Sequence, residues 1–509
     1  MTSTAIRPLP RSPLNPFGLE DTHEDADGIR HYDDLPASLI DVLTHWAAAT
    51  PDVEAVVELG GERLSYAGLL DRASRVAGGL LAVGLEPGDR VALRYAAGVD
   101  WVVGFWGTLL AGGIAVAVNT RFAEPEVDYA LRIADVRIVL GPTAPLPSGE
   151  PYVHAGARPD DVAAIFYTSG TTGHPKAAPT THHAFLSNAE TMVRALDIPR
   201  DKSGDLRTLI SVPLFHVTGC NSQLLTAAYL GGTSVILPGL DLDAFLAALT
   251  SERITFIVTV PAVYNLLVRR LANSPADVSG VSLVGYGGAP IAASLVEALR
   301  ATFTWARVFN GFGMTETASL ISVLPDRDAA EHADSIGFPV PVIDIALDPV
   351  GGTDHGELLV RGPNVLAGYW GSADPALTDG WFRTGDVVTV DEEGRIRLVD
   401  RVKDLINRGG ENVASVEVEA ALLGTPGVLE AAVLGVPDEV MGEKVGAVIV
   451  PAGDDLDVEK VLSDLGTRLA DYKVPQYVAV HTGPLPRNAG GKVLKHRLRD
   501  GIHWGLPRR

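Results

Sequence analysis

The densest group of chemically useful residues is a ten-residue run at positions 167–176, which reads Tyr-Thr-Ser-Gly-Thr-Thr-Gly-His-Pro-Lys. It follows an apolar segment, residues 162–166, that has the pattern of a buried strand. Glycines let a backbone approach a phosphate closely, and backbone N–H groups together with a lysine hold its negative charge. The run is not a GxxxxGK[ST] loop, because that string does not occur. We expect a phosphate-binding loop of another kind, formed by Thr168, Ser169, Gly170, Thr171, Thr172, Gly173 and Lys176.

Short motifs downstream carry residues of the kinds that bind nucleotides, metals or acids, and each also has an ordinary structural explanation. Thr315 and Glu316 suit the first turn of a helix, and Asp386 after a glycine suits a turn. Arg401 suits a solvated surface, and His216 in an apolar run suits a satisfied core position. Taken alone, these residue types leave binding and structural roles open.

The order of these motifs along the chain carries more information than any one of them. From about residue 39 to residue 499 the chain resembles the superfamily of acyl-CoA synthetases, nonribosomal-peptide adenylation domains and firefly-type luciferases. Besides the 167–176 run, the motifs are Pro-Leu-Phe-His (213–216), Gly-Gly-Ala-Pro (287–290), Gly-Phe-Gly-Met-Thr-Glu-Thr (311–317), Thr-Gly-Asp (384–386), Asp-Arg-Val-Lys-Asp (400–404), Gly-Gly-Glu-Asn (409–412) and Leu-Pro-Arg-Asn-Ala-Gly-Gly-Lys (485–492). The resemblance implies activation of a carboxylic acid as its acyl-AMP, with ATP, Mg²⁺ and coenzyme A as cofactors and co-substrates.

The resemblance also implies a nucleotide site. Glu316 would hold Mg²⁺, a cation that prefers carboxylate and phosphate oxygens, and Thr315 would hydrogen-bond a phosphate. Asp386 would accept hydrogen bonds from both ribose hydroxyls, and Arg401 would donate to the same sugar. Phe312 stands where the family commonly has tyrosine, and its ring can still lie against the adenine. The remaining residues of this set are Gly287, Gly288, Ala289, Pro290, Gly311, Gly313 and Met314.

Lys492 is the catalytic residue that the resemblance predicts most sharply. A lysine at this position contacts the substrate carboxylate and the α-phosphate, where negative charge collects in the transition state. The alternative is one more exposed lysine in a basic tail. By resemblance, a hinge near Lys403 then turns the C-terminal domain, so that Lys492 leaves and the Gly409–Gly410 face arrives to open a channel for coenzyme A.

The acyl pocket is expected to be uncharged. We assign it His216, Val217, Thr218, Gly219, Cys220, Asn221 and Tyr286, and we place His216 at the pocket or its gate among the candidate catalytic residues without assigning it acid–base work. No aspartate is present in the 215–218 run to hold a substrate ammonium, so an amino acid is disfavoured. A fatty or aromatic acid is therefore expected, since an unpaired buried charge is costly.

Three other functions fit parts of this pattern. The enzyme could load the phosphopantetheine of a carrier protein, act as a luciferase-type oxygenase, or be an inactive nucleotide-binding protein. The presence of Lys492, Glu316 and Asp386 argues against the last of these. Because the sequence ends at Arg509 without an appended carrier domain, free coenzyme A is the expected acceptor. Two departures, Ala177 in place of a usual glycine and the run 413–415, leave the exact loop paths open but not the activity class.

Length and composition require several compact units and argue against some partners. A chain of 509 residues, 46% of them apolar, exceeds what one ordinary core organises. Its net charge of −22 repels phosphate backbones and anionic lipids, so nucleic acid or a membrane surface is not expected as the main partner. The single cysteine suits a reducing cytoplasm. The uncharged residues 101–118 contain glycines that fit a buried helix followed by a strand better than a transmembrane span.

Elements that could position these motifs alternate along the chain. Helix-like and strand-like segments follow one another from residue 39, which is typical of α/β layers with largely parallel sheets. After residue 356 short strands with glycine-containing turns indicate a small β-rich region. We predict an α/β fold with a large N-terminal domain of layered, mostly parallel sheets, followed by a small mobile α+β C-terminal domain. The predicted boundaries are a flexible arm at 1–34, an AMP-binding domain at 35–402 and a lid domain at 403–509.

Overall fold

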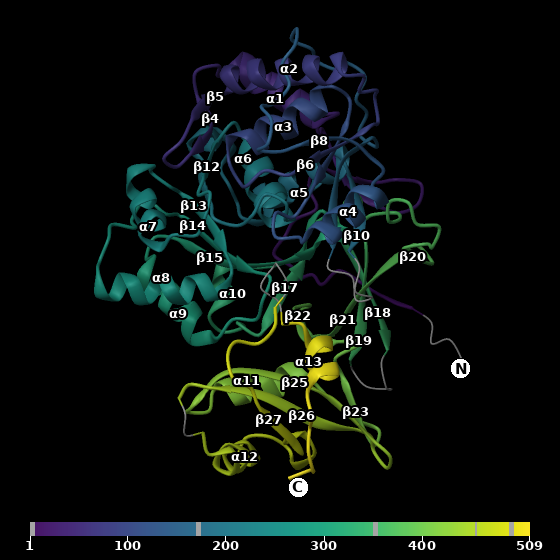
Figure 1. Cartoon of the computed structure of the whole chain (residues 1–509), viewed down its shortest axis with the longest axis vertical. Helices are drawn as coiled ribbons and strands as arrows, with labels where there is room; N and C mark the ends of the chain where they lie inside the picture. Colours follow the sequence, from purple (N-terminus) through teal and green to yellow (C-terminus); the bar gives the residue numbers. More distant parts are fainter. Residues whose placement is uncertain (1–5, 169–174, 350–354, 454–455, 488–492, 509) are drawn as a thin grey trace.

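The computed structural model describes residues 6–168, 175–349, 355–453, 456–487 and 493–508. Figure 1 shows a large upper part, formed by the first three quarters of the chain, and a smaller C-terminal unit below it. The fold is mixed α/β, as the alternation of segments predicts.

One sheet of the upper part has five strands in the order β10-β9-β7-β6-β8. Its first four strands in sequence are parallel, and β10 runs antiparallel to β9. The predicted helix and strand of residues 101–118 are confirmed as α3 and β7, which are almost wholly buried and therefore apolar on every side. The elements are β6 (Arg90–Leu93), α3 (Val99–Leu110), β7 (Ile114–Ala117), α4 (Glu124–Ile133), β8 (Val136–Leu140), β9 (Val162–Thr168) and β10 (Lys176–Thr181).

A second, larger sheet begins as a run of parallel strands in the order β4-β12-β11-β13-β14-β15, with β5 antiparallel at its edge. Buried apolar side chains of β13 and β14 form a core with three of the helices, α7, α8 and α9. The elements are α1 (Leu39–Ala49), β4 (Glu54–Glu58), β5 (Arg63–Ser65), α2 (Tyr66–Ala82), α5 (His182–Ala195), β11 (Arg207–Ile210), α6 (Thr226–Tyr229), β12 (Thr233–Ile236), α7 (Leu242–Ser251), β13 (Phe256–Thr259), α8 (Pro261–Asn273), β14 (Leu283–Gly287), α9 (Ala293–Thr302) and β15 (Arg307–Met314).

The predicted β-rich region continues this sheet. After β15 the pairing becomes antiparallel, and the chain reaches the new strands through β16, β17 and β22. The region is thus hydrogen-bonded to the parallel strands and is not a free-standing unit. Its elements are β16 (Ser319–Leu324), α10 (Asp326–Ala329), β17 (Ser335–Pro339), β18 (Asp344–Pro349), β19 (Gly356–Arg361), β20 (Leu377–Thr378), β21 (Trp381–Val390) and β22 (Ile396–Arg401).

The C-terminal unit has a hydrophobic core of its own, built from β25, β26, α11 and α12. Its five strands are mostly antiparallel, with β27 parallel to β26. Figure 1 shows the unit at the bottom of the molecule in yellow-green and yellow. Its elements are β23 (Ile406–Arg408), β24 (Glu411–Val413), α11 (Ser415–Leu423), β25 (Val428–Asp438), β26 (Gly442–Pro451), α12 (Val458–Gly466), β27 (Tyr477–Val480) and α13 (Lys495–Gly501).

The predicted flexible arm is wrong for residues 6–34. Strand β1 (Arg7–Leu9) pairs antiparallel with β18, and the guanidinium of Arg11 donates to the carbonyls of Pro339 and Val340. Phe17 is buried, and β2 (Thr22–Glu24) with β3 (Arg30–Tyr32) forms a hairpin. A polar segment with few apolar residues orders here because a distant sheet edge supplies the unpaired backbone groups that it needs. Across the described residues, no helix combines the length and the apolar character that a membrane span needs.

Candidate active site

The strands β9 and β10, which flank the predicted phosphate loop, lie next to the Thr315–Glu316 motif. Thr168, the last residue of β9, is the strand partner of Lys176, the first residue of β10. The short helix η3 (Thr315–Thr317) follows β15 directly and packs against both β9 and β10. Residues 169–174, which include Ser169, Gly170, Thr171, Thr172 and Gly173, lie outside the described part. The site thus lies beyond the carboxyl ends of parallel strands, where open α/β sheets bind ligands.

The predicted adenine seat is a close backbone contact between β14 and β15. Gly287 is the strand partner of Gly311, and a Cβ on Gly287 would lie 2.4 Å from the carbonyl oxygen of Gly311. Only glycine fits there. Residues 288–290, which follow the end of β14, are exposed. Phe312 is half-buried and packs on the hydrophobic core. An open backbone shelf beside an aromatic ring is suited to a flat base.

The two residues predicted to hold the ribose are in contact. Asp386 on β21 and Arg401 on β22 are strand partners, and a guanidinium nitrogen of Arg401 lies 2.7 Å from a carboxylate oxygen of Asp386. Asp386 is 4% exposed, and its backbone N–H donates to the hydroxyl of Thr384. The ion pair holds a charged carboxylate in a fixed orientation at the edge of the site, as recognition of two adjacent hydroxyls requires.

Glu316 lies in the centre of the site, and its environment fits a divalent cation held partly by phosphates. Its carboxylate is 9% exposed and accepts a 2.9 Å hydrogen bond from the hydroxyl of Tyr369. Burial raises the pKa of Glu316, while Tyr369, Arg401 and Lys176 oppose that rise. Among the described residues no three histidine, cysteine or acidic side chains gather as a complete metal cage. A single carboxylate suits Mg²⁺, which takes its other ligands from phosphates and water.

Tyr369 is the residue that sequence reasoning missed. The ammonium of Lys176 lies 4.6 Å from the centre of its ring, so Tyr369 joins the phosphate-loop lysine to Glu316. It lies 53 residues from Glu316 in sequence, in the string Gly-Tyr-Trp at 368–370. An aromatic pair after a glycine usually indicates packing, so nothing local predicts this contact.

Replacing Tyr369 with phenylalanine is expected to raise the apparent Mg²⁺ requirement of acyl-AMP formation roughly tenfold, the equivalent of about 1.5 kcal/mol for one hydrogen bond to a charged group. The carboxylate of Glu316 loses its donor, whereas the ring under Lys176 remains. Mg²⁺ titrations of acid-dependent ATP–pyrophosphate exchange measure the effect. The KM for ATP serves as the internal control and should stay within about threefold of wild type. An unchanged Mg²⁺ requirement would show that the hydroxyl does not support Glu316.

The predicted acyl-pocket residues are buried to different degrees. His216 is half-buried against Phe215 and is followed by the π-helix η2 (Thr218–Leu225), a rare form that is frequent at functional sites. Burial and the nearby charge of Arg121 lower the pKa of His216 to about 4, so the ring is neutral at pH 7. Val217 and Cys220 belong to one hydrophobic core and Tyr286 to another, with Tyr286 1% exposed. Asn221 is fully buried, and its amide nitrogen donates to the carbonyl of Ala318. Thr218 is half-buried.

The C-terminal motifs lie near the boundary between the two parts of the chain. Lys403 is exposed in the turn after β22, and Gly409 and Gly410 form the exposed turn between β23 and β24, both with positive φ. Lys492 lies outside the described residues, but Arg487 and Val493 on its two sides pair as a β-bridge. Gly409, Gly410 and the residues that flank Lys492 belong to the C-terminal unit, and Lys403 lies in the turn that leads into it.

A chain of polar contacts links the segment after Lys492 to the upper part. The ammonium of Lys495 donates to the hydroxyl of Ser415, and that hydroxyl donates to the carboxylate of Asp400 on β22. Arg401 of the predicted ribose site follows Asp400 directly. Figure 1 shows α13, which begins at Lys495, between the C-terminal sheet and β22. The segment that follows Lys492 is thus linked to the strand that carries Arg401.

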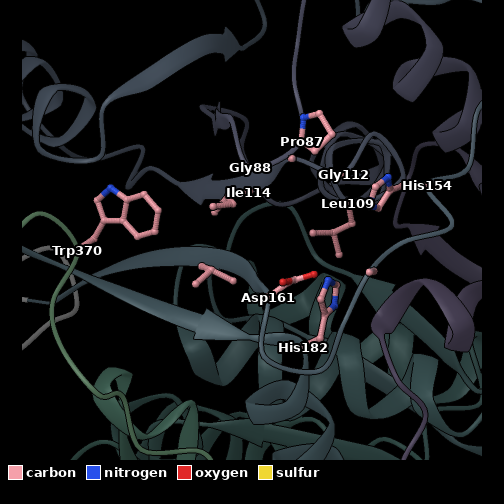
Figure 2. A pocket seen from close by; sticks show the side chains of 12 residues that line it. Pro87, Gly88, Leu109, Gly112, Ile114, His154, Asp161, His182 and Trp370 are labelled. Carbon is pink, nitrogen blue, oxygen red and sulfur yellow. The ribbon is translucent and has the colours of Figure 1, made fainter.

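A separate cavity of about 380 Å³ opens on the first sheet. Figure 2 shows His154, Asp161 and His182 towards one end of it and Trp370 at the other. Burial lowers the pKa of His182 to about 4, so this ring is neutral at pH 7. None of the predicted site residues lines the cavity, although one lining residue, Trp370, is the sequence neighbour of Tyr369.

Family models match most of the chain. The AMP-binding enzyme model matches residues 43–153 and 142–370, and the AMP-binding enzyme C-terminal domain model matches residues 417–492. The chain belongs to the AMP-binding enzyme family. The spans of the two matches agree with the large and small parts of the fold, and the resemblance stated from the motifs is confirmed.

Individual members of the AMP-binding enzyme family match over almost the whole chain. A feruloyl-CoA synthase of an Amycolatopsis species is 37% identical over 482 residues, which cover 89% of this chain and 96% of that protein. A long-chain-fatty-acid–CoA ligase of Mycobacterium tuberculosis is 32% identical over 508 residues, or 92% of this chain and 99% of the other. The o-succinylbenzoate CoA synthetase of Bacillus subtilis, solved with its acyl-adenylate intermediate, superposes with a TM-score of 0.84 at 28% identity, covering 92% of this chain and 99% of that one. The same synthetase has been solved with ATP and magnesium ion.

This member of the AMP-binding enzyme family is an AMP-forming acid–CoA ligase. It activates a carboxylic acid with ATP as the acyl-AMP and transfers the acyl group to coenzyme A, with Mg²⁺ as the metal.

The fold accommodates alanine at position 177, where the family usually has glycine. The side chain of Ala177 is buried in a small apolar cluster, and its carbonyl accepts from the N–H of Trp370. In the run 413–415, Ser415 makes the contact with Asp400.

Proposed function

We propose that this ligase activates an aromatic acid of the arylalkenoic kind and that its acceptor is free coenzyme A. The observation that carries the acid class is the uncharged segment at the predicted acyl pocket, in which His216 is a neutral ring and residues 217–220 bear no charge. Such a wall favours an aryl group over an amino acid or a dicarboxylate. The 37% identity to a feruloyl-CoA synthase, over 96% of that protein, supports the same class.

In the proposed first half-reaction the substrate carboxylate attacks the α-phosphorus of ATP in line, and pyrophosphate leaves. Lys492 contacts the carboxylate and the α-phosphate, and Thr315 donates to a phosphate oxygen. Asp386 and Arg401 hold the ribose, while the 287–290 shelf and Phe312 hold the adenine. Glu316 and the phosphates would hold Mg²⁺, which would neutralise charge on the triphosphate. Catalysis here is mainly positioning and charge stabilisation, as in other phosphoryl chemistry.

In the proposed second half-reaction the lid domain, residues 403–509, turns about a hinge at Lys403 on the AMP-binding domain, residues 35–402. Lys492 leaves, and Gly409 with Gly410 lines the path of coenzyme A. The thiolate attacks the acyl carbonyl carbon, the bond from that carbon to the phosphate oxygen breaks, and AMP leaves. The separate core of the C-terminal unit and the exposure of Lys403 support this division.

A panel of acids with ATP and coenzyme A tests the proposed function. Hydroxycinnamic acids are expected to give a kcat/KM at least about tenfold above long-chain fatty acids, because one mismatched group changes discrimination by about 1–3 kcal/mol. AMP release and thioester mass are read together. Long-chain fatty acids are the second candidate, and the 32% identity to a long-chain-fatty-acid–CoA ligase supports them. Faster turnover with fatty acids, amino acids or dicarboxylates would refute the aromatic assignment.

The acceptor and the compartment belong to the same proposal. Thioester formed only on a phosphopantetheinylated carrier protein, and never on free coenzyme A, would refute coenzyme A as the acceptor.

We also propose a cytoplasmic location. The single, buried and unpaired cysteine and the similarity to CoA ligases support it.

A further inference from the structure

The backbone just after Glu316 adopts a conformation that L-residues rarely adopt. Ala318 has a φ of 50° and Ser319 a φ of 121°. Among the described non-glycine residues with positive φ, these two are the only adjacent pair, and only Ser319 exceeds 60°. Such residues persist where their surroundings hold them in place, and they cluster at functional sites.

Side chains from three other segments hold this turn. The amide nitrogen of Asn221 donates to the carbonyl of Ala318 at 2.8 Å, and the hydroxyls of Ser222 and Ser319 lie 2.6 Å apart. Asn364 donates to the carbonyl of Thr317 at 2.8 Å. The amide oxygen of Asn188 accepts from the N–H of Leu320 at 3.1 Å. All four side chains are buried, so the strained turn is enclosed by polar contacts that water does not compete for.

Two of these four side chains belong to the π-helix that begins beside His216. Asn221 and Ser222 are consecutive residues of η2, and both point to the turn. The N-terminal part of the same helix is fixed to the Pro-Leu-Phe-His run, because the N–H of Cys220 donates to the carbonyl of His216. A Cβ on Gly219 would lie only 2.6 Å from the carbonyl of Pro213. The π-helix is therefore in contact with the predicted acid-binding segment on one side and with the Thr315–Glu316 turn on the other.

We propose that Asn221 and Ser222 are positioning residues for acyl-AMP formation. They hold Ala318 and Ser319 in the strained conformation, and this fixes Thr315 and Glu316 against the phosphates and the metal. The inference deepens the proposed function and rests on it for the identity of the acid-binding segment. It moves Asn221 from the lining of the acyl pocket to the support of the nucleotide site.

The bonding of Asn221 makes it a clean probe. Its amide nitrogen has the contact to Ala318, while its amide oxygen has no hydrogen-bond partner within the described part of the chain. Truncation therefore removes the unsatisfied amide oxygen together with the donor to the carbonyl of Ala318, so that the turn loses this one contact. Gln223, two residues on, is the matched control. It is equally buried in the same helix, but its amide donates to Thr208 and to the carbonyl of Leu209, away from the turn.

The test compares Asn221→Ala with Gln223→Ala in the full chain, using the acid that gives the fastest AMP release. For Asn221→Ala the kcat of ATP–pyrophosphate exchange should fall about 10- to 100-fold, because small misplacements of catalytic groups have effects of that size. Calorimetric Kd values for ATP and for the acid should stay within about threefold. Thioester formation from synthetic acyl-AMP and coenzyme A should stay near the wild-type rate. Gln223→Ala should keep the exchange kcat within about threefold of wild type.

Several results would overturn the inference. An exchange kcat for Asn221→Ala equal to that of Gln223→Ala would remove the positioning role, and a raised Kd for the acid with an unchanged kcat would return Asn221 to the pocket lining. Equal losses in both half-reactions would indicate a general structural defect. If thermal unfolding shows that Asn221→Ala is not folded, Ser222→Ala replaces it under the same criteria. If the wild-type enzyme prefers another acid class, the aromatic assignment is refuted. The comparison of Asn221→Ala with Gln223→Ala is unaffected, because it uses whichever acid gives the fastest AMP release.

Discussion

Replacing Lys492 with alanine should slow acyl-AMP formation from acid and ATP by about 10²–10³-fold, the cost of losing one preorganised contact to charge that develops in a transition state. Thioester formation from synthetic acyl-AMP and coenzyme A should continue at a near-normal rate, because in the proposed mechanism the lid domain has by then turned this lysine away. Measuring the two half-reactions separately on one folded variant gives the result.

The C-terminal unit offers a matched control for this experiment. Lys460 is an exposed lysine at the start of α12, in the same unit as Lys492, and Lys460→Ala should leave both half-reactions unchanged. Equal losses in both half-reactions of Lys492→Ala would mean that the lysine is structural or that the domains do not alternate. No loss in either would make it an ordinary surface lysine.

Asp386→Ala is expected to weaken ATP binding by roughly 10- to 100-fold or more. In the proposed role of Asp386, the change removes charge-assisted hydrogen bonds to the ribose, each worth about 1.5–3 kcal/mol. It also leaves Arg401, 2.7 Å from Asp386 in the intact protein, without this partner. Calorimetric titration of ATP into the folded variant measures the loss.

Asp391 provides the control for Asp386. It lies near the other end of the β21–β22 pair and has its own ion pair, at 3.1 Å, with Arg395. Asp391→Ala should therefore lose an acid–arginine contact of the same kind while it retains the ATP affinity of wild type. An unchanged ATP affinity in Asp386→Ala would show that Asp386 serves only the ion pair with Arg401 and does not hold the ribose.

The fold class and the family could be predicted from the sequence because their signals are local. A strand such as β13 (256–259) or β19 (356–361) is recognisable from its own apolar residues and flanking turns. The helix and strand within 101–118 follow from two adjacent glycines and a β-branched run. The Asp386–Arg401 contact could also be anticipated, since the motif order assigns both residues to one sugar and strand pairing then joins them.

Other features were decided by the tertiary structure alone. Residues 6–34 have the composition of a flexible arm, yet they are ordered by a sheet edge formed by residues 344–349. Tyr369 contacts Glu316 across 53 residues, and Asn221 contacts Ala318 across 97. Contacts between residues this far apart leave no regular spacing in the sequence from which they could be predicted. Tyr369 reaches the carboxylate of Glu316, and Asn221 reaches the carbonyl of Ala318, only because packing brings these distant segments together. The sequence by itself thus determined the chemistry of the groups at this site, and the packing of distant segments determined which side chains hold them in place.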